Sequence, residues 1–178
     1  FGGAVDVVYG DMTDQASLRS AMTGVDGLFL LTPPDERMAA LSHEAVVAAQ
    51  ATGVSHVVKL SAIGASVESP LQLGRWHGAM EEELAESGAG FTILRAASFM
   101  QNFLNHVPTI LAQSQVYSAN GDGQIAMIDA RDIGVAAAHV LIDPTPHHGR
   151  SYELTGGEAL SDREATARLS KALGRDLS

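Results

Sequence analysis

HVVKLSAIGAS (residues 56–66), RWHGAMEEELAESG (75–88) and FTILRAASFMQNF (91–103) follow one another near the middle of this chain. The first and third segments begin with apolar runs of strand length, whereas the second has the pattern of a helix. Together they predict a strand, a helix and a second strand. Polar side chains gather at one end of this unit, which is where open α/β sheets hold their ligands.

The same alternation of strand and helix extends toward the start of the chain. Apolar runs at residues 5–9 and 27–31 are each followed by a helical pattern, over 14–24 and 35–50. Continuous apolar runs are typical of buried parallel strands. We therefore predict an α/β fold with a doubly wound parallel sheet, right-handed crossovers and helices on both faces.

Beyond residue 100 the pattern is less regular. Ser161 and Glu164 have the spacing of a capping box at the start of a helix. The expected elements are a helix over 102–112 interrupted by Pro108, a strand over 125–128, a helix over 133–142 capped by Asp132, a strand over 151–154, and a last helix that ends at Gly174.

The length of the chain predicts one domain over residues 1–178. Within it, we expect residues ~99–130 and 145–178 to form a small C-terminal, substrate-side subdomain. The first residues, FGGAVDVVYGD, read as the end of a loop that enters a strand. We therefore expect the domain to be N-terminally incomplete in this sequence.

The composition argues against several classes of protein. A net charge of −10 opposes binding to nucleic acid or to an anionic membrane surface. The absence of cysteine excludes disulfides and thiolate metal sites, and no apolar run approaches the ~20 residues that span a bilayer. His147 and His148 have no third ligand at metal-binding spacing, so no metal is expected. A small-molecule partner and a cytoplasmic location fit these features, and a homodimer is left open.

Seven segments, in a consistent order, resemble the NmrA-like branch of the atypical short-chain dehydrogenases. They are GDMTD (10–14), LLTPP (30–34), HVVKLSAIGA (56–65), RWHGAMEEELAESG (75–88), FTILRAASFMQNF (91–103), DARDIG (129–134) and YELTGGEALS (152–161). The resemblance implies a Rossmann fold that binds NAD(P). Two features depart from the family pattern. The glycine-rich turn near the start is absent from this sequence, and His77-x-x-x-Glu81 stands where ordinary short-chain dehydrogenases carry Tyr-x-x-x-Lys.

The resemblance also implies a cofactor site at the ends of the strands. Asp11 would accept a hydrogen bond from the adenine amine, with Met12 against the ring, although an aspartate here is also typical of a turn. The cofactor is NADP or NAD, with NADP favoured. The other residues implied to contact it are Leu31, Thr32, Pro33, Ser61, Ala62, Ser98 and Phe99.

Ser61, His77 and Glu81 are the candidate catalytic residues. By resemblance, Ser61 donates a hydrogen bond to the substrate oxygen, and His77 donates a proton as hydride arrives. Glu81, one helical turn further on, would orient the imidazole or raise its basicity. The structural alternatives are a serine that caps a turn and a histidine that packs or faces solvent. Lys59, inside the strand, is interpreted as a structural or cofactor-edge residue.

The segment after the second strand supplies candidates for substrate contacts. Phe99, Met100 and Asn102 suit a flat substrate, whereas Phe103 is expected in the core. We predict an NAD(P)H-dependent oxidoreductase that transfers hydride to a small conjugated or quinone-like acceptor. The alternatives are a non-catalytic NAD(P)-binding sensor with a protein partner, and an epimerase-like isomerase.

Overall fold

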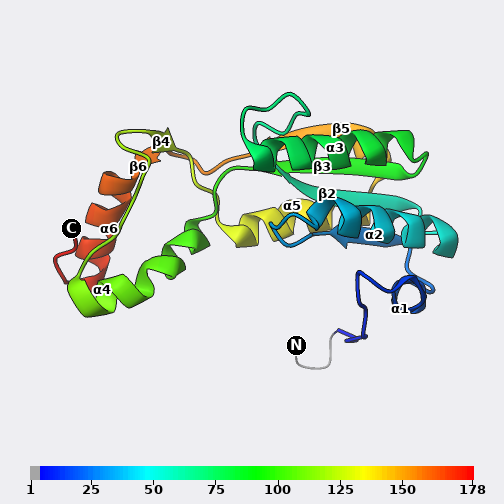
Figure 1. Cartoon of the computed structure of the whole chain (residues 1–178), viewed down its shortest axis with the longest axis horizontal. Coiled ribbons are helices and arrows are strands. Elements are labelled where there is room, and N and C mark those ends of the chain that lie inside the picture. Colours follow the sequence, from blue (N-terminus) through cyan, green and yellow to red (C-terminus); the bar gives the residue numbers. More distant parts are fainter. Residues whose placement is uncertain (1–4) are drawn as a thin grey trace. The chain divides into compact units, whose positions relative to one another are not determined.

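Figure 1 shows the computed structural model, which describes residues 5–178. Its main sheet has four parallel strands in the order β1-β2-β3-β5. The predicted α/β class with a Rossmann-like parallel sheet is therefore confirmed. The strands are β1 (Gly27–Leu30), β2 (His56–Ala62), β3 (Gly90–Ala96) and β5 (Arg150–Leu154).

Helices alternate with these strands along the chain, as the apolar pattern predicts. Asp14 caps the first helix by accepting a hydrogen bond from the amide of Ala16 at 2.9 Å. Gly53 ends the second helix in the left-handed conformation, with φ of 81°. The helices are α1 (Gln15–Ala21), α2 (Met38–Thr52), α3 (Gln72–Glu86) and α5 (Ala130–Ile142).

Both faces of the sheet are covered by helices. Val57 of β2 belongs to the core formed with α1, α2 and α3. Gly27 of β1 points to the opposite face, because a side chain there would meet Leu141 of α5 at 2.8 Å. Successive strand residues alternate between faces, so Lys59 and Ser61 share the face of Val57. These two polar residues therefore lie beneath α2 and α3.

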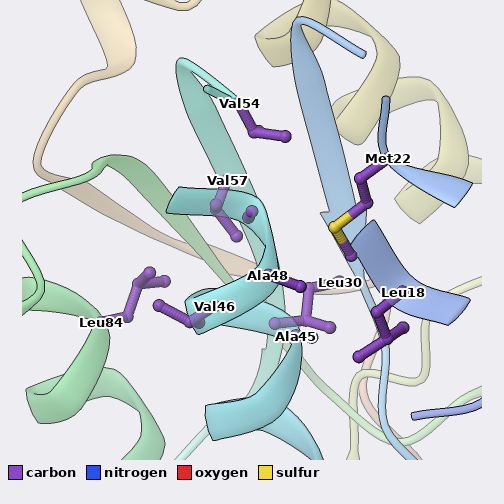
Figure 2. Packing of buried hydrophobic residues seen from close by; sticks show 10 residues of the cluster. Leu18, Met22, Leu30, Ala45, Val46, Ala48, Val54, Val57 and Leu84 are labelled. Carbon is purple, nitrogen blue, oxygen red and sulfur yellow. The ribbon is translucent and has the colours of Figure 1, made fainter. Parts of the chain in front are cut away.

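A cluster of buried apolar side chains joins β1 and β2 to the three helices on that face (Figure 2). Alanines on α2 allow the helix to lie close to the strands. Burial of each larger side chain contributes about 1.5–3 kcal/mol. The cluster consists of Leu18, Met22, Leu30, Ala45, Val46, Ala48, Ala49, Val54, Val57 and Leu84.

The chain divides into two compact units. The first contains Phe1–Arg95 and Ala136–Tyr152, and the second contains Ala96–Val135 and Glu153–Ser178. The expected single domain over 1–178, with a substrate-side subdomain at residues ~99–130 and 145–178, stays a prediction.

The second unit contains short elements around a two-stranded antiparallel sheet. Pro108 lies in the first turn of an α-helix, where its missing N–H costs little, and the preceding turns are 3₁₀. The predicted capping box of Ser161 and Glu164 is confirmed, and so is the helix end at Gly174. The elements are η1 (Met100–His106), α4 (Val107–Gln113), β4 (Gln124–Ile125), β6 (Leu160–Ser161) and α6 (Asp162–Leu173).

Several expectations about local structure are wrong. The strand expected over 125–128 covers only Gln124–Ile125, and the helix expected over 102–112 is replaced by η1 followed by α4. Residues 5–9 form no strand, and Val7 and Tyr9 are 80% and 79% exposed, because no neighbouring backbone among the described residues pairs with this run. The second helix begins at Met38 instead of residue 35, and α5 begins at Ala130. Asp132 therefore lies inside the first turn of α5 and is not its N-cap.

Within residues 5–178, none of the helices combines the length and the apolar character needed to cross a bilayer.

Candidate active site

Buried polar side chains follow the ends of β1 and β2, as expected for the carboxyl edge of a parallel sheet. Thr32 follows β1 and is 5% exposed, and Ser61, near the end of β2, is 4% exposed. The hydroxyl of Thr32 has no hydrogen-bond partner among the described residues. A buried hydroxyl without a partner costs about 1–3 kcal/mol. This edge of the sheet therefore holds a polar atom that a ligand could satisfy.

Ser61, Glu81 and Arg95 form a continuous chain of hydrogen bonds across three elements. Ser61 Oγ of β2 donates to Glu81 Oε1 of α3 at 2.5 Å. Arg95 of β3 donates from Nε to both carboxylate oxygens, at 3.1 and 3.2 Å, and from Nη2 to Oε2 at 2.5 Å. The Glu81 side chain is 8% exposed and the Arg95 side chain 32%. The carboxylate is thus held between a hydroxyl and a guanidinium.

This hydrogen-bonded network gives the contacts of Glu81, which was expected to orient His77 or to raise its basicity. Its hydrogen bonds within the described residues go to Ser61 and Arg95, and its charge raises the pKa of His77 against the effect of burial. The network alters the role expected for Ser61, whose single hydroxyl proton is donated to the carboxylate. Ser61 therefore cannot at the same time donate to a substrate oxygen, as the resemblance implied. Among the described residues, the arrangement supports Ser61 as an acceptor.

His77 lies on α3, one turn before Glu81, and is half-buried. Its Nδ1 is buried and has no hydrogen-bond partner in the described part of the chain. Burial and the nearby Lys59 ammonium lower the pKa of His77 to about 4, and Glu81 opposes this shift. At pH 7 only about one imidazole in a thousand is therefore charged. Proton donation from an imidazolium at this position is disfavoured.

Lys59 is completely buried on the face covered by α2 and α3. Its Nζ donates to the carbonyl of Leu60 at 3.0 Å. Burial lowers the pKa of Lys59 to about 8, and the charge of Glu81 opposes this shift. The interpretation of Lys59 as a structural or cofactor-edge residue stays a prediction, but its charge clearly acts on His77.

Two glycines allow α3 to lie against the loop that follows β2. A Cβ at Gly74 would stand 2.2 Å from Ser69 Oγ, and a Cβ at Gly78 would stand 2.3 Å from the carbonyl carbon of Ser66. Only a residue without a side chain fits at such distances. Gly78 lies between His77 and Glu81 in sequence, so this close packing fixes the height of both side chains above β2.

Asp11 and Met12, the residues implied to contact adenine, form part of a turn before α1. Asp11 Oδ1 accepts from the amide and the hydroxyl of Thr13, at 2.8 and 2.7 Å. These two hydrogen bonds lower the pKa of Asp11. The turn alternative therefore describes its local structure, and the adenine contact stays a prediction. Leu31 and Pro33, which flank Thr32 in the sequence, are exposed. Ala62, which follows Ser61, is half-buried.

The expected substrate-contact residues lie in the second unit. Asn102 Nδ2 donates to Ser98 Oγ at 3.2 Å, and Met100 is 48% exposed. Phe99 is half-buried and pairs through its backbone with Ile128. These residues begin the segment that enters η1, and their role in substrate binding stays a prediction.

Phe103 is not a core residue, contrary to expectation, because η1 packs with no residue fully buried. Instead it lines two hollows within the second unit. The first, of about 200 Å³, is mostly polar and includes Asn102, His106 and Asp162. The second, of about 350 Å³, is mostly apolar and includes Met100. Phe103 therefore separates a polar hollow from an apolar one.

Arg95 is the residue of the hydrogen-bonded chain that the sequence interpretation missed. It is the one charged residue in strand β3, GFTILRA, where Thr92 is the other polar residue. A charged side chain inside a buried strand needs a partner. This isolated charge was the sequence signal that could have identified Arg95 as part of the hydrogen-bonded chain. Among residues 5–178, no group of three or more acidic or histidine side chains is arranged to hold a metal ion.

An open parallel sheet with buried polar groups at its carboxyl edge defines a Rossmann-type nucleotide-binding protein. Sequence comparison agrees with this class. The chain belongs to the NAD(P)H-binding family, whose model matches residues 2–144. The resemblance to NmrA-like atypical short-chain dehydrogenases is thereby confirmed.

Curated relatives of known name include two reductases. The chain is 37% identical to an NAD(P)H azoreductase of Xenophilus azovorans over 171 residues, which cover 96% of this chain and 59% of the relative. It is 40% identical to the (4-alkanoyl-5-oxo-2,5-dihydrofuran-3-yl)methyl phosphate reductase of Streptomyces griseus subsp. griseus over 184 residues, which cover 99% of this chain and 62% of the relative. The chain thus spans less than two thirds of the length of either.

A solved structure has the same fold. The NADPH-dependent quinone oxidoreductase of Escherichia coli, in complex with NADPH, superposes with a TM-score of 0.84 at 33% identity. The match covers 98% of this chain and 61% of that protein.

Proposed function

We propose that the protein is an NAD(P)H-dependent oxidoreductase that transfers hydride to a small conjugated or quinone-like acceptor. Its membership of the NAD(P)H-binding family supports the cofactor. The printed names of its relatives, an azoreductase and a quinone oxidoreductase, support the acceptor class. Azo compounds and quinones are both conjugated, and both accept hydride. We favour NADPH over NADH because the superposed quinone oxidoreductase holds NADPH.

The observation that carries this proposal is a pair of buried polar atoms without partners. Thr32 Oγ1 lies just after β1, and His77 Nδ1 lies on α3 one turn before the residue that binds Ser61. Two such atoms near the carboxyl edge are costly unless a ligand satisfies them. The residues present therefore fit a polar ring system such as nicotinamide. We assign Thr32, Ser61 and His77 to that end of the cofactor.

The remaining cofactor residues are assigned by family resemblance. Asp11 and Met12 would contact the adenine, and the lowered pKa of Asp11 keeps its carboxylate an acceptor at neutral pH. The segments around Leu31, Pro33 and Ala62 would contact the cofactor through their backbones. Ser98 and Phe99 complete the set.

The chemistry divides between the cofactor and the protein. When bound, the reduced nicotinamide supplies the hydride, and the protein supplies orientation and electrostatics. Lys59 provides a buried positive charge close enough to act on His77. A positive charge at this edge would favour the electron-rich form of the acceptor as hydride arrives. Neutral His77 would then hydrogen-bond to the acceptor without carrying charge.

We place the substrate contacts on Phe99, Met100 and Asn102. Support comes from the second unit, where the hollow of about 200 Å³ lies beside Asn102 and Phe103. An aromatic side chain next to an amide suits a flat molecule with polar substituents.

A second candidate function is a non-catalytic NAD(P)-binding sensor. One observation favours it, namely that neither His77, with its pKa lowered to about 4, nor Ser61, which donates to Glu81, is an obvious proton donor. Such a protein would bind the cofactor without turnover.

The test is to follow NADPH absorbance with a panel of quinones and azo dyes, and to measure NADPH binding in parallel. Turnover of at least one acceptor supports the oxidoreductase. Binding without turnover of any acceptor supports the sensor and refutes the enzyme. His77→Phe would lower turnover if the imidazole contacts the acceptor, and unchanged turnover would refute only that assignment. A cytoplasmic location and a homodimer stay predictions, for cell fractionation and size-exclusion chromatography to check.

A further inference from the structure

We infer that Ser61 binds the cofactor as a hydrogen-bond acceptor for the carboxamide amine of the nicotinamide, and that Glu81 and Arg95 are positioning residues that hold its hydroxyl proton. This inference rests on the proposed NAD(P)H-dependent function. It replaces the role in which Ser61 donates to the substrate.

The first step is the direction of the Ser61 hydroxyl. A serine hydroxyl has one proton to donate and two lone pairs that accept. The proton is directed to Glu81 Oε1 at 2.5 Å, which is the length of a hydrogen bond to a charged acceptor. Within residues 5–178 no donor is directed to Ser61 Oγ. The oxygen therefore keeps its lone pairs for a ligand.

The second step is the charge of Glu81. An ionised carboxylate only accepts hydrogen bonds, so it cannot donate back to Ser61 and reverse the direction. Arg95 is paired with this carboxylate, because its guanidinium donates three hydrogen bonds to the two oxygens. Such a two-pronged pair is geometrically specific as well as strong. Arg95 thus acts on Ser61 through Glu81.

The third step is the chemistry of the ligand. The oxygens of a quinone and the nitrogens of an azo bond are acceptors and carry no proton. Placed against an acceptor such as Ser61 Oγ, they would be left unsatisfied. The carboxamide of nicotinamide carries an N–H₂ group and therefore complements Ser61. A ribose hydroxyl can also donate, and the experiment separates the two.

The experiment compares binding of NADPH with binding of its reduced 3-acetylpyridine analogue, by titration calorimetry in the absence of any acceptor. The analogue keeps the carbonyl but has a methyl group in place of the amine. If Ser61 accepts from that amine, the wild type should bind NADPH about 3- to 10-fold more tightly than the analogue. Ser61→Ala should bind both equally, and Ser61→Thr should restore the preference.

Glu81→Gln tests the positioning role. The glutamine amide can donate a hydrogen bond to Ser61 Oγ, and the serine proton is then free to donate elsewhere. The variant should therefore bind NADPH and the analogue with nearly equal affinity. Glu82→Gln is the matched control, because Glu82 is the exposed neighbour on the same helix. It should keep the wild-type preference. Thermal unfolding of each variant checks the fold, and if Glu81→Gln does not fold, the two Ser61 variants still decide the donor question.

Several outcomes overturn the inference. Equal binding of both dinucleotides by the wild type would show that the amine meets no acceptor. A preference that survives in Ser61→Ala would place the acceptor elsewhere. Equal weakening of both ligands by Ser61→Ala would indicate the ribose hydroxyl or a purely structural link between β2, α3 and β3. If the wild type binds neither dinucleotide, the proposed function fails as well, which distinguishes the two failures.

Discussion

Arg95 Nη2 lies 2.5 Å from Glu81 Oε2, so an ion pair joins β3 to α3 directly above the end of β2. The carboxylate is almost fully buried, whereas about a third of the arginine side chain reaches solvent. Removing Arg95 and removing Glu81 should therefore have different effects on stability. Loss of the arginine leaves a buried charge, and loss of the carboxylate leaves a cation that water can reach.

Arg95→Met should therefore destabilise the fold. A buried carboxylate left without its partner costs 3–5 kcal/mol in a fully buried pair, and the exposure of Arg95 reduces this to about 2 kcal/mol. Urea denaturation at pH 7 measures the free energy of unfolding. Arg168→Met is the control, because Arg168 pairs with Glu158 and both side chains are 59% exposed, so its loss should stay within experimental error. Equal effects of the two substitutions would contradict this prediction.

Lys59 should make stability rise with pH. Its pKa is lowered from 10.5 to about 8 in the folded state, so between these values the unfolded chain binds a proton that the folded chain does not. The free energy of unfolding should therefore increase by about 3 kcal/mol from pH 8 to pH 10.5, relative to Lys59→Met. Denaturation curves at several pH values measure the difference. Lys171→Met, at an exposed position, should follow the wild type; parallel curves for wild type and Lys59→Met would contradict the prediction.

His77 should have an effect of the same sign at acidic pH, where stability should also rise with pH. Its pKa is lowered from 6.5 to about 4 in the folded state. Between these pH values His77 is therefore protonated in the unfolded chain but neutral in the folded chain. Stability should fall between pH 6.5 and pH 4 by about 1–2 kcal/mol more than in His77→Phe, after allowance for partial exposure. The imidazole C2 proton signal in NMR should titrate near pH 4. A midpoint above pH 6 would show that the imidazole is not held neutral.

Thr32→Val should separate stability from binding. Because Thr32 Oγ1 is buried without a partner in residues 5–178, replacing the hydroxyl with a methyl should leave the free energy of unfolding unchanged or raise it by up to about 1 kcal/mol. Affinity for NADPH should fall at the same time. Thr92→Val is the contrast, because the Thr92 hydroxyl hydrogen-bonds to His56 and to the carbonyl of His147. That variant should lose about 1–3 kcal/mol. A loss of stability in Thr32→Val similar to that of Thr92→Val would mean that Thr32 has a structural partner.

The sequence indicates which polar residues lie near the strand ends better than it indicates which of them contact one another. Ser61 and Glu81 are both recognisable, one at a strand end and one on the following helix. Helical spacing pairs Glu81 with His77 because it describes neighbours on one helix only. The real partners come from β2 and β3, and a tertiary contact of this kind leaves no periodic signal. In the sequence, only Arg95 indicates this tertiary contact, because it is a charged residue within a mostly apolar strand.

The errors in the fold have similar physical causes. A β-branched run such as residues 5–9 becomes a strand only where another backbone pairs with it, and residue preference does not report the neighbour. Phe103 is expected in the core but is only half-buried. Its place on η1, beside two hollows, depends on a 3₁₀ segment that hydrophobic periodicity does not reveal.

The packing at Gly78 has a mechanical consequence. Its α-carbon lies so close to the backbone of Ser66 that α3 cannot rise from the loop after β2 without opening a gap, nor approach it without a clash. Loop and helix must therefore move as one body, and His77 and Glu81 move with them. An insertion in residues 63–71 would therefore displace α3 and change the length of the Ser61–Glu81 hydrogen bond. The tolerance of this loop to changes in length should be set by the 2.5 Å hydrogen bond that Glu81 accepts one turn further along the same helix.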